Sequence, residues 1–218
     1  MSSKDDRPPS GVRGEYARLA ARYDERWVEY NLRSLDLLRP HLADRDAGTL
    51  LDQGCGTANL VPRLAEWGTR VQRYHGADLS AEMLRAAAPR VRAAPFPAAL
   101  LAANAAALPL RTASIDTIVS ASTLHDWDDP RGALAEARRV LRPGGRLLLL
   151  DWSRQRVTMR ALNLALRITR NPFHRMYSRD EAEALLTAAG FRVVSAERRP
   201  ITWMWELMVI EAVASGAA

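Results

Sequence analysis

The sequence predicts an α/β domain with a mostly parallel sheet and helices on both faces. Short apolar strands alternate with helical patterns along most of the chain, and the first strand ends in a glycine-rich turn. Regular alternation of this kind is typical of βαβ units, in which a helix connects two parallel strands. Within the expected strand 146–150, residues 147–150 are continuously apolar, as expected for a strand buried on both faces of a parallel sheet. A chain of 218 residues suffices for one domain with a large core.

The N-terminal residues set the first boundary of this domain. Residues 1–14 are polar and contain proline, which predicts a flexible tail, and residues 15–218 then form a single domain. From Val12 to Leu38, aromatic and aliphatic residues recur at spacings of three and four, which predicts one helix that ends at Pro40.

Seven strands follow. The expected strands lie at 49–52, 71–77, 98–103, 115–120, 146–150, 191–197 and 203–213, with helices at 58–67, 81–88, 130–141 and 179–189. No helix separates the last two strands, so we expect an antiparallel C-terminal strand. Residues 153–177 form an insertion after the fifth strand, with a helix of their own.

The composition excludes several classes of protein. No apolar run approaches the roughly 20 residues that a membrane-spanning helix needs. The polar start contains no stretch typical of a signal peptide, so we expect a cytoplasmic protein. Cys55 is the single cysteine, which excludes an intramolecular disulfide and a cysteine-based metal cluster.

The first candidate binding element is a strand that ends in glycines and leads into a helix. Its residues 50–57 read LLDQGCGT. Glycine allows a backbone to approach a ligand closely, and the N–H groups at the start of the helix then face that ligand. The same residues would also fit an ordinary tight turn between a strand and a helix.

An acidic residue at the end of the second strand strengthens this interpretation. Asp78 follows the glycine turn at about the spacing at which a carboxylate accepts hydrogen bonds from ribose hydroxyls. The alternative is a helix N-cap, for which Ser80 is better placed. The two elements together predict a nucleoside-bearing cofactor. Asn59 occupies the position where a dinucleotide-binding motif needs its third glycine, which argues against a nicotinamide cofactor.

Four further motifs follow in a fixed order. They are Asn104–Ala105, IDTIVS at 115–120, Leu124–His125, and LRPGGRL at 141–147. Together with the glycine turn and Asp78, they resemble the class I S-adenosylmethionine-dependent methyltransferases. Within that class the chain is most similar to the small-molecule group that includes the ubiquinone and menaquinone methyltransferases. The resemblance runs from about residue 16 to about residue 213. It implies a Rossmann-like fold and S-adenosylmethionine as the methyl donor.

The resemblance also implies which residues bind the cofactor. The set comprises Tyr23, Asp52, Gly54, Cys55, Gly56, Asp78, Leu79, Met83, Asn104, Ala105, Ser120 and Ala121. The two glycines would face the methionine part, Asp78 the ribose, and Leu79 and Met83 the adenine. Ser120 and Ala121 would lie beside the sulfonium.

Two members of this set leave alternatives open. Asn104 stands where the family usually has aspartate, and its side-chain oxygen can still accept a hydrogen bond from the adenine amino group. The backbone of Ala105 would contact the ring. Tyr23 matches a family element that closes over the cofactor, but it could equally be a core aromatic residue of its helix.

His125 is the candidate general base, because it follows the fourth strand at the edge where open α/β sheets bind ligands. Asp126 or Asp128 could orient it. The alternative is a structural histidine that holds its loop by hydrogen bonds. Asp129 is expected to cap the helix that follows, and no metal site is expected.

Residues 156–170 predict a basic amphipathic helix within the insertion. Arginines 156, 160, 167 and 170 follow one stripe, whereas Val157, Ala161, Leu164, Ala165 and Ile168 follow another. Residues 152–179 contain seven arginines and no acid. Three interpretations remain open: a lid with its apolar face inward, a site for an anionic acceptor, or a contact with an anionic membrane that gives access to a lipid or quinone.

Methyl transfer to a small-molecule acceptor is therefore the leading hypothesis for the function, with the acceptor unidentified. A nucleic-acid methyltransferase would suit the net charge of +6, but no N/D-P-P-Y/F signature follows Ser120. A catalytically degenerate binding protein is the third hypothesis. Asn104 supports it, as does Ala58, which occupies a position where many methyltransferases carry glycine.

Overall fold

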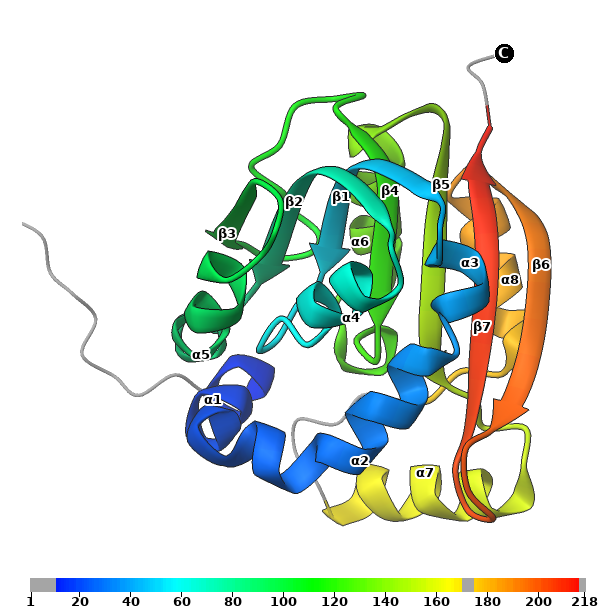
Figure 1. The fold of residues 1–218 in the computed structure, drawn as a ribbon. Coiled ribbons are helices and arrows are strands. Elements are labelled where there is room, and N and C mark those ends of the chain that lie inside the picture. Colours follow the sequence, from blue (N-terminus) through cyan, green and yellow to red (C-terminus); the bar gives the residue numbers. More distant parts are fainter. Residues whose placement is uncertain (1–10, 170–174, 216–218) are drawn as a thin grey trace, which may run out of the picture.

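The computed structural model describes residues 11–169 and 175–215 and contains a seven-stranded sheet (Figure 1). The strands are β1 (Asp46–Gln53), β2 (Arg70–Asp78), β3 (Ala98–Ala102), β4 (Ile115–Ala121), β5 (Leu141–Trp152), β6 (Phe191–Pro200) and β7 (Glu206–Ala214). Their order across the sheet is β3-β2-β1-β4-β5-β7-β6. The first five are parallel, and β7 runs antiparallel to β5 and to β6. The predicted fold class is confirmed.

Helices cover both faces of this sheet (Figure 1). They are α1 (Gly11–Leu19), the 3-10 turn η1 (Ala20–Arg22), α2 (Tyr23–Asp36), α3 (Arg39–Leu42), α4 (Leu60–Glu66), α5 (Ala81–Arg92), the 3-10 turn η2 (Leu124–Asp126), α6 (Pro130–Val140), α7 (Val157–Thr169) and α8 (Arg179–Ala188). Side chains of α2 to α5 pack in one core cluster, and those of α6 and α8 pack in the other.

Alternation along the strands divides the core between the two faces. Leu50 and Leu51 are neighbours on β1 and both fully buried, yet each belongs to a different cluster. Successive side chains of a strand point to opposite faces, so a strand covered by helices on both sides is apolar throughout. This explains why residues 147–150 of β5 form an unbroken apolar segment.

The N-terminal region differs from the prediction in two ways. Helix α1 begins at Gly11, so the last four residues of the expected tail 1–14 are helical. Residues 1–10 of that tail lie outside the described residues. The single helix expected from Val12 to Leu38 is also divided by η1, because α1 packs against α5 whereas α2 follows the core beneath the sheet. An apolar period along a sequence does not record such a change of direction.

The ends of other helices and strands also differ from the prediction. Helix α5 continues through Pro89 to Arg92, beyond the expected end at residue 88. Strand β7 begins at Glu206, so Trp203 lies in the turn before it instead of on the expected strand 203–213. Among the described residues, no helix combines the length and apolar character needed to cross a bilayer.

We predict that Leu150→Ala lowers the free energy of unfolding by about 3 kcal/mol, because it leaves a cavity in the core beside β5. Leu150 has no exposed surface, whereas Leu164 on α7 is 60% exposed. Leu164→Ala is therefore the matched control and should change the stability by less than about 0.5 kcal/mol. Urea denaturation of both variants measures the difference. Equal losses would contradict the placement of these two side chains.

Candidate functional site

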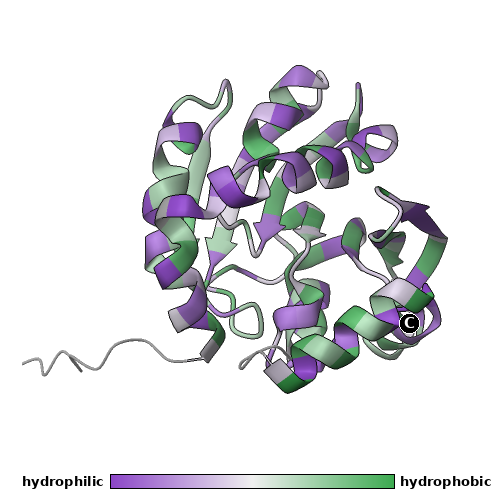
Figure 2. Cartoon of the chain, turned by 90° about the horizontal axis from the view of Figure 1, so that it is seen from below, coloured by the Kyte–Doolittle hydropathy of each residue, from purple (hydrophilic) through white to green (hydrophobic). Residues whose placement is uncertain are grey.

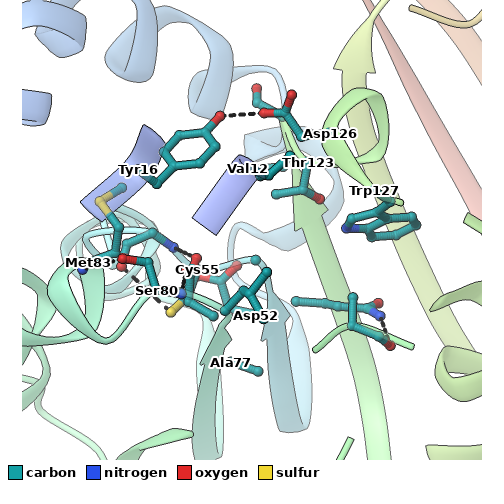
Figure 3. Close-up of a pocket in the computed structure, with 18 of the residues that line it drawn as sticks. Val12, Tyr16, Asp52, Cys55, Ala77, Ser80, Met83, Thr123, Asp126 and Trp127 are labelled. Atoms are coloured by element: carbon teal, nitrogen blue, oxygen red, sulfur yellow. Dashed lines mark hydrogen bonds between the residues drawn. The ribbon is translucent and has the colours of Figure 1, made fainter. Parts of the chain in front are cut away.

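A cavity lies at the carboxyl ends of β1, β2 and β4, beneath α1 (Figure 3). Open α/β sheets bind ligands at this edge. Eleven residues predicted to bind a cofactor line it: Tyr23, Asp52, Gly54, Cys55, Gly56, Asp78, Leu79, Met83, Asn104, Ala105 and Ala121. Residues that the sequence did not single out include Val12, Arg13, Tyr16, Asn31, Ser34, Gln53, Ser122, Thr123 and Trp127.

The glycine turn after β1 forms the floor of the cavity. Gly54 has a φ of +82°, and a Cβ atom at this position would lie 2.3 Å from Cγ2 of Thr123. Gly56 has a φ of +53°, and its N–H donates to Oδ2 of Asp78 at 2.9 Å. Both the left-handed backbone and the close approach of the loop to Thr123 therefore require glycine at position 54.

Asp78 is fixed in place by two backbone groups. Its other oxygen, Oδ1, accepts the N–H of Ser80 at 2.8 Å. Burial raises the pKa of Asp78, and the bonds from Ser80 and Gly56 partly offset that rise. The hydroxyl of Ser80 accepts the N–H of Met83, so Ser80 is the cap of α5, as predicted. Asp78 therefore shapes the glycine turn and also lines the cavity.

Asp52 is a second buried acid at the cavity. It accepts a hydrogen bond from the Tyr74 hydroxyl at 2.8 Å. Burial raises the pKa of Asp52 to about 7, although the bond from Tyr74 acts in the opposite direction. The acids lining the cavity are Asp52, Asp78, Asp126, Asp128 and Asp129, against the single cation Arg13. This charge balance favours a positively charged ligand.

Gln53 carries an unsatisfied acceptor at one end of the cavity. Its Nε2 donates to the carbonyl oxygens of Ala105 and Ala133 at 3.1 and 3.3 Å. Its Oε1 is buried and finds no hydrogen-bond partner among the described residues. Asn104 Oδ1, which we expected to bind a ligand, already accepts the N–H of Ala106 at 2.9 Å. A bound group that donates hydrogen bonds would therefore satisfy Gln53.

Helices α1 and α2 form the roof. The Tyr16 hydroxyl donates to Oδ2 of Asp126 at 2.5 Å, which ties α1 to the loop after β4 (Figure 3). Tyr16 also lies 6.1 Å from Tyr23, measured between ring centroids. Asn31 on α2 lines the cavity, and its Nδ2 is buried without a hydrogen-bond partner in the described part of the chain. The sequence shows Tyr16 only as part of an apolar helical pattern, and nothing in it singled out Asn31.

Asp24, at the start of α2, is hydrogen-bonded to the segment that follows the glycine turn, which forms the floor of the cavity. Its Oδ1 accepts from the Thr57 hydroxyl and from Nδ2 of Asn59 at 2.7 and 3.1 Å. Its Oδ2 accepts from Arg90 at 2.7 Å. These bonds lower the pKa of Asp24, although burial, the largest single effect, raises it. Nothing in the sequence predicted the contacts of Asp24, apart from its position next to Tyr23.

The structure does not support His125 as the base, because His125 is absent from the lining of the cavity. His125 is 4% exposed, and its ring lies nearly parallel to the Trp152 ring with 4.1 Å between the ring centroids. Its Nδ1 bonds Oδ1 of Asp151 at 2.7 Å, and its Nε2 lies 3.5 Å from Oδ2 of Asp126. Asp151, rather than Asp128, is therefore the acid that orients it together with Asp126.

Charge explains why His125 is unsuited to accept a proton. Burial alone would lower its pKa, but the carboxylates of Asp151 and Asp126 outweigh that effect and raise the pKa to about 9. The ring is then protonated at neutral pH, so Nδ1–H donates to Asp151. The structural alternative of the sequence analysis describes this histidine better.

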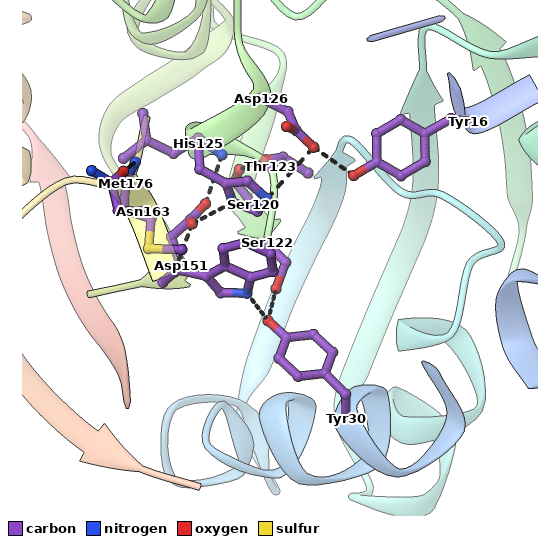
Figure 4. Close-up of polar contacts among 12 residues, drawn as sticks. Tyr16, Tyr30, Ser120, Ser122, Thr123, His125, Asp126, Asp151, Asn163 and Met176 are labelled. Atoms are coloured by element: carbon purple, nitrogen blue, oxygen red, sulfur yellow. Dashed lines mark hydrogen bonds and ion pairs between the residues drawn. The ribbon is translucent and has the colours of Figure 1, made fainter. Parts of the chain in front are cut away.

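Ser120 does not lie where we expected a residue that contacts the cofactor. Its side chain is fully buried, its hydroxyl bonds that of Thr123 at 2.6 Å, and it does not line the cavity. Ser122 lines the cavity instead, with a φ of +58°. The Ser122 hydroxyl bonds the Tyr30 hydroxyl at 2.6 Å, and Trp152 Nε1 donates to Tyr30 at 2.7 Å (Figure 4).

Further expectations concern the cap of α6 and the insertion after β5. Asp129 accepts the N–H of Gly132 and caps α6, as predicted. The described part of the insertion, residues 153–169 and 175–177, contributes nothing to the lining of the cavity. Along α7, Val157, Leu164 and Ile168 are exposed, so the expectation of an inward apolar stripe is wrong. In the described ranges no group of three His, Cys, Asp or Glu residues could hold a metal.

Sequence comparison finds similarity to methyltransferases. Residues 51–149 match the model of a family described as "Methyltransferase domain". A "Ubiquinone/menaquinone biosynthesis C-methyltransferase" of Syntrophotalea carbinolica is 35% identical over 162 residues, which cover 69% of this chain and 65% of that protein. An "Uncharacterized methyltransferase" of Mycobacterium bovis is 37% identical over 59% of this chain and 48% of its own length. The matched region thus spans about half to two thirds of these relatives.

Solved structures share the fold at lower identity. A putative methyltransferase from Haloferax volcanii, solved with the methyltransferase activator Trm112, has a TM-score of 0.79 at 19% identity and covers 94% of this chain and 100% of its own. The 1,6-didemethyltoxoflavin-N1-methyltransferase of Burkholderia thailandensis, solved with 1,6-didemethyltoxoflavin and S-adenosylhomocysteine, has a TM-score of 0.70 at 21% identity. It covers 99% of this chain and 98% of its own.

We predict that Gly54→Ala destabilises the protein by at least about 1 kcal/mol more than Gly144→Ala. Both glycines have a positive φ, but nothing lies within 4 Å of a Cβ built on Gly144. The control therefore carries only the backbone strain, whereas Gly54→Ala adds a clash with Thr123. Chemical denaturation measures the two losses, and equal values would show that the loop tolerates a side chain.

His125 predicts a specific dependence of stability on pH. Its pKa of about 9 in the folded protein exceeds the ordinary value of 6.5. The charged ring therefore stabilises the fold fully below pH 6.5, by about 3 kcal/mol, and this contribution is lost as the pH rises through 9. We expect the stability difference between the wild type and His125→Gln to shrink between pH 6.5 and 10. A difference independent of pH would show that His125 is neutral in the folded protein.

Proposed function

We propose that this chain, whose residues 51–149 match a methyltransferase family, transfers a methyl group from S-adenosylmethionine to a small-molecule acceptor. The cavity beneath α1 carries the proposal, since the glycine turn, the fixed carboxylate of Asp78 and an excess of acids meet there. The acceptor would enter the same cavity on the side of α2, where Asn31 and Ser34 line it.

The lining residues fit the cofactor chemically. Of the five acidic side chains, Asp52 is only partly ionised near pH 7, but the group as a whole still suits a ligand that carries a sulfonium and an ammonium group, because opposite charges attract strongly in a partly buried site. Asp78 can accept hydrogen bonds from sugar hydroxyls. The orphan oxygen of Gln53 can accept a hydrogen bond from the amino group of a base. Tyr23, Met83 and Leu79 supply apolar surface for the nucleoside.

S-Adenosylmethionine supplies a methyl group that its sulfonium already activates. The protein is then needed mainly to align the acceptor with that methyl group and to exclude water. Tyr16 serves both purposes, because its bond to Asp126 holds α1 over the cavity. Asp24 adds to the alignment by fixing α2 to the loop after Gly56.

We propose an uncharged, planar acceptor of the quinol type. An anionic acceptor would meet five carboxylates and one arginine in the cavity. A planar ring would instead find the aromatic side chains of Tyr16, Tyr23 and Trp127 along the lining. The name of the Syntrophotalea relative, a C-methyltransferase of ubiquinone and menaquinone biosynthesis, supports a ring of this class.

Asp126 is the proposed proton acceptor, in place of His125. Methylation at a ring carbon would form the carbon–methyl bond while the sulfur–methyl bond of the donor breaks, and it would leave a ring proton to be removed. Asp126 lines the cavity and is held between the Tyr16 hydroxyl and the imidazolium of His125. His125 is then a positioning residue that acts through Asp126.

We expect the wild-type protein to bind S-adenosylhomocysteine with micromolar affinity, and Asp78→Ala to weaken that binding at least about tenfold, or about 1.4 kcal/mol. The variant loses the ribose acceptor and also the bond that shapes the turn at Gly56. Isothermal titration calorimetry measures both affinities.

Asp36→Ala is the control, because Asp36 is an exposed acid on α2 away from the lining. It should bind like the wild type. A wild-type protein that binds no S-adenosylhomocysteine would reject the proposed function. Transfer of a labelled methyl group to a naphthoquinol that lacks its ring methyl group tests the acceptor class separately.

A further inference from the structure

Helix α7 turns an apolar face toward solvent. Val157, Leu164 and Ile168 are 76%, 60% and 75% exposed, and Ala161 lies between them on the same face. These four residues recur at spacings of four, three and four, so they form one stripe along the helix. Figure 2 views the molecule from the side on which α7 lies and shows green segments along this helix.

The opposite face of α7 is already occupied. Met159 is fully buried, and Leu162 and Leu166 pack against the core cluster beneath the sheet. The exposed stripe therefore does not result from a helix that has turned its core face outward. The helix carries apolar residues on both sides, and only one side is covered within the described structure.

Arginines flank the exposed stripe. Arg160 and Arg167 are exposed on α7, and Arg156 precedes the helix. None of the three forms an ion pair with residues 11–169 or 175–215, and the sequence has no acid between 152 and 179. In contrast, Arg154 is paired with Glu181. The free arginines leave a positive charge beside the apolar stripe.

An exposed tryptophan extends the same surface. Trp203 is 77% exposed in the turn between β6 and β7. The Thr158 hydroxyl donates to the carbonyl of Met204 at 2.8 Å, which fixes this turn against the start of α7. In Figure 1 the turn lies beside α7 on the side of the sheet where the parallel strands end.

We propose that this surface, formed by the exposed stripe of α7, its arginines and Trp203, binds a lipid bilayer that contains anionic phospholipids. A helix lying in the bilayer interface inserts its apolar side chains among the acyl chains, while flanking arginines bind phosphate groups. Tryptophan favours the same depth in the interface. The inference is independent of the proposed function.

Charge favours a bilayer over a second copy of the chain. A twofold interface brings the same patch of two molecules together. Arg160 and Arg167 of both copies would then lie close to one another, with no acid on α7 to compensate them. Anionic headgroups instead supply the opposite charge along the whole stripe.

The test is sedimentation of the full chain with vesicles. We expect the wild type to bind vesicles of phosphatidylglycerol and phosphatidylcholine, and to bind pure phosphatidylcholine at least tenfold more weakly. Leu164→Gln/Ile168→Gln should lower binding to the anionic vesicles at least tenfold. Arg160→Gln/Arg167→Gln should lower it by about fivefold for each arginine and reduce its dependence on salt.

The control is Val194→Gln/Arg111→Gln, which changes an exposed valine on β6 and an exposed arginine before β4. It should bind vesicles like the wild type, and all variants should keep the wild-type melting temperature within a few degrees. Failure of the wild type to bind anionic vesicles, or an equal loss in the control, would overturn the proposal. So would a dimer in analytical ultracentrifugation that only Leu164→Gln/Ile168→Gln dissociates.

Discussion

The carboxylate of Asp78 is the group on which the geometry of the site depends. It accepts the N–H groups of Gly56 and Ser80, and thereby joins the turn after β1 to the start of α5. A buried carboxylate is costly unless it is hydrogen-bonded, so these bonds compensate for the burial that raises its pKa. The same carboxylate lines the cavity. Shape and charge of the site thus have a common origin.

A second network holds the opposite rim. Asp151 accepts the N–H of Leu124 and bonds His125, which lies flat on Trp152. A buried histidine between two acids is better explained as a fixed cation than as a base, because its proton is held by charges on both sides. The loop after β4, including Asp126, is thereby supported from beneath. A group that takes part in a reaction at this rim must reach the cavity, and His125 does not line it.

The sequence predicted the parts of the fold that follow from local patterns. The caps at Ser80 and Asp129 and the glycine turn depend on residues close together in the chain, and the structure has them where we expected. All seven expected strands are present, although the ends of several differ from the prediction. Ala58 adopts the left-handed conformation with a φ of +58°, which is the conformation that favours glycine.

Residues whose roles depend on distant neighbours could not be predicted in this way. His125 looked like a base because the motif does not show that Asp151, on another strand, lies beneath it. The outward face of α7 was unpredictable for a similar reason. Both faces of that helix are apolar, and only contacts from residues such as Trp152 and Leu207 in the core decide which face is covered.

The clamp at Asp24 has a consequence for how the molecule reaches its native state. It joins residues 33, 35 and 66 positions apart in the chain, and the bond from Tyr16 to Asp126 spans 110 positions. Contacts that close such long loops have a high entropic cost and form slowly unless other structure has already brought their ends together. The assembled sheet brings these distant segments together, and it thereby lowers the entropic cost of closing the roof over the cavity.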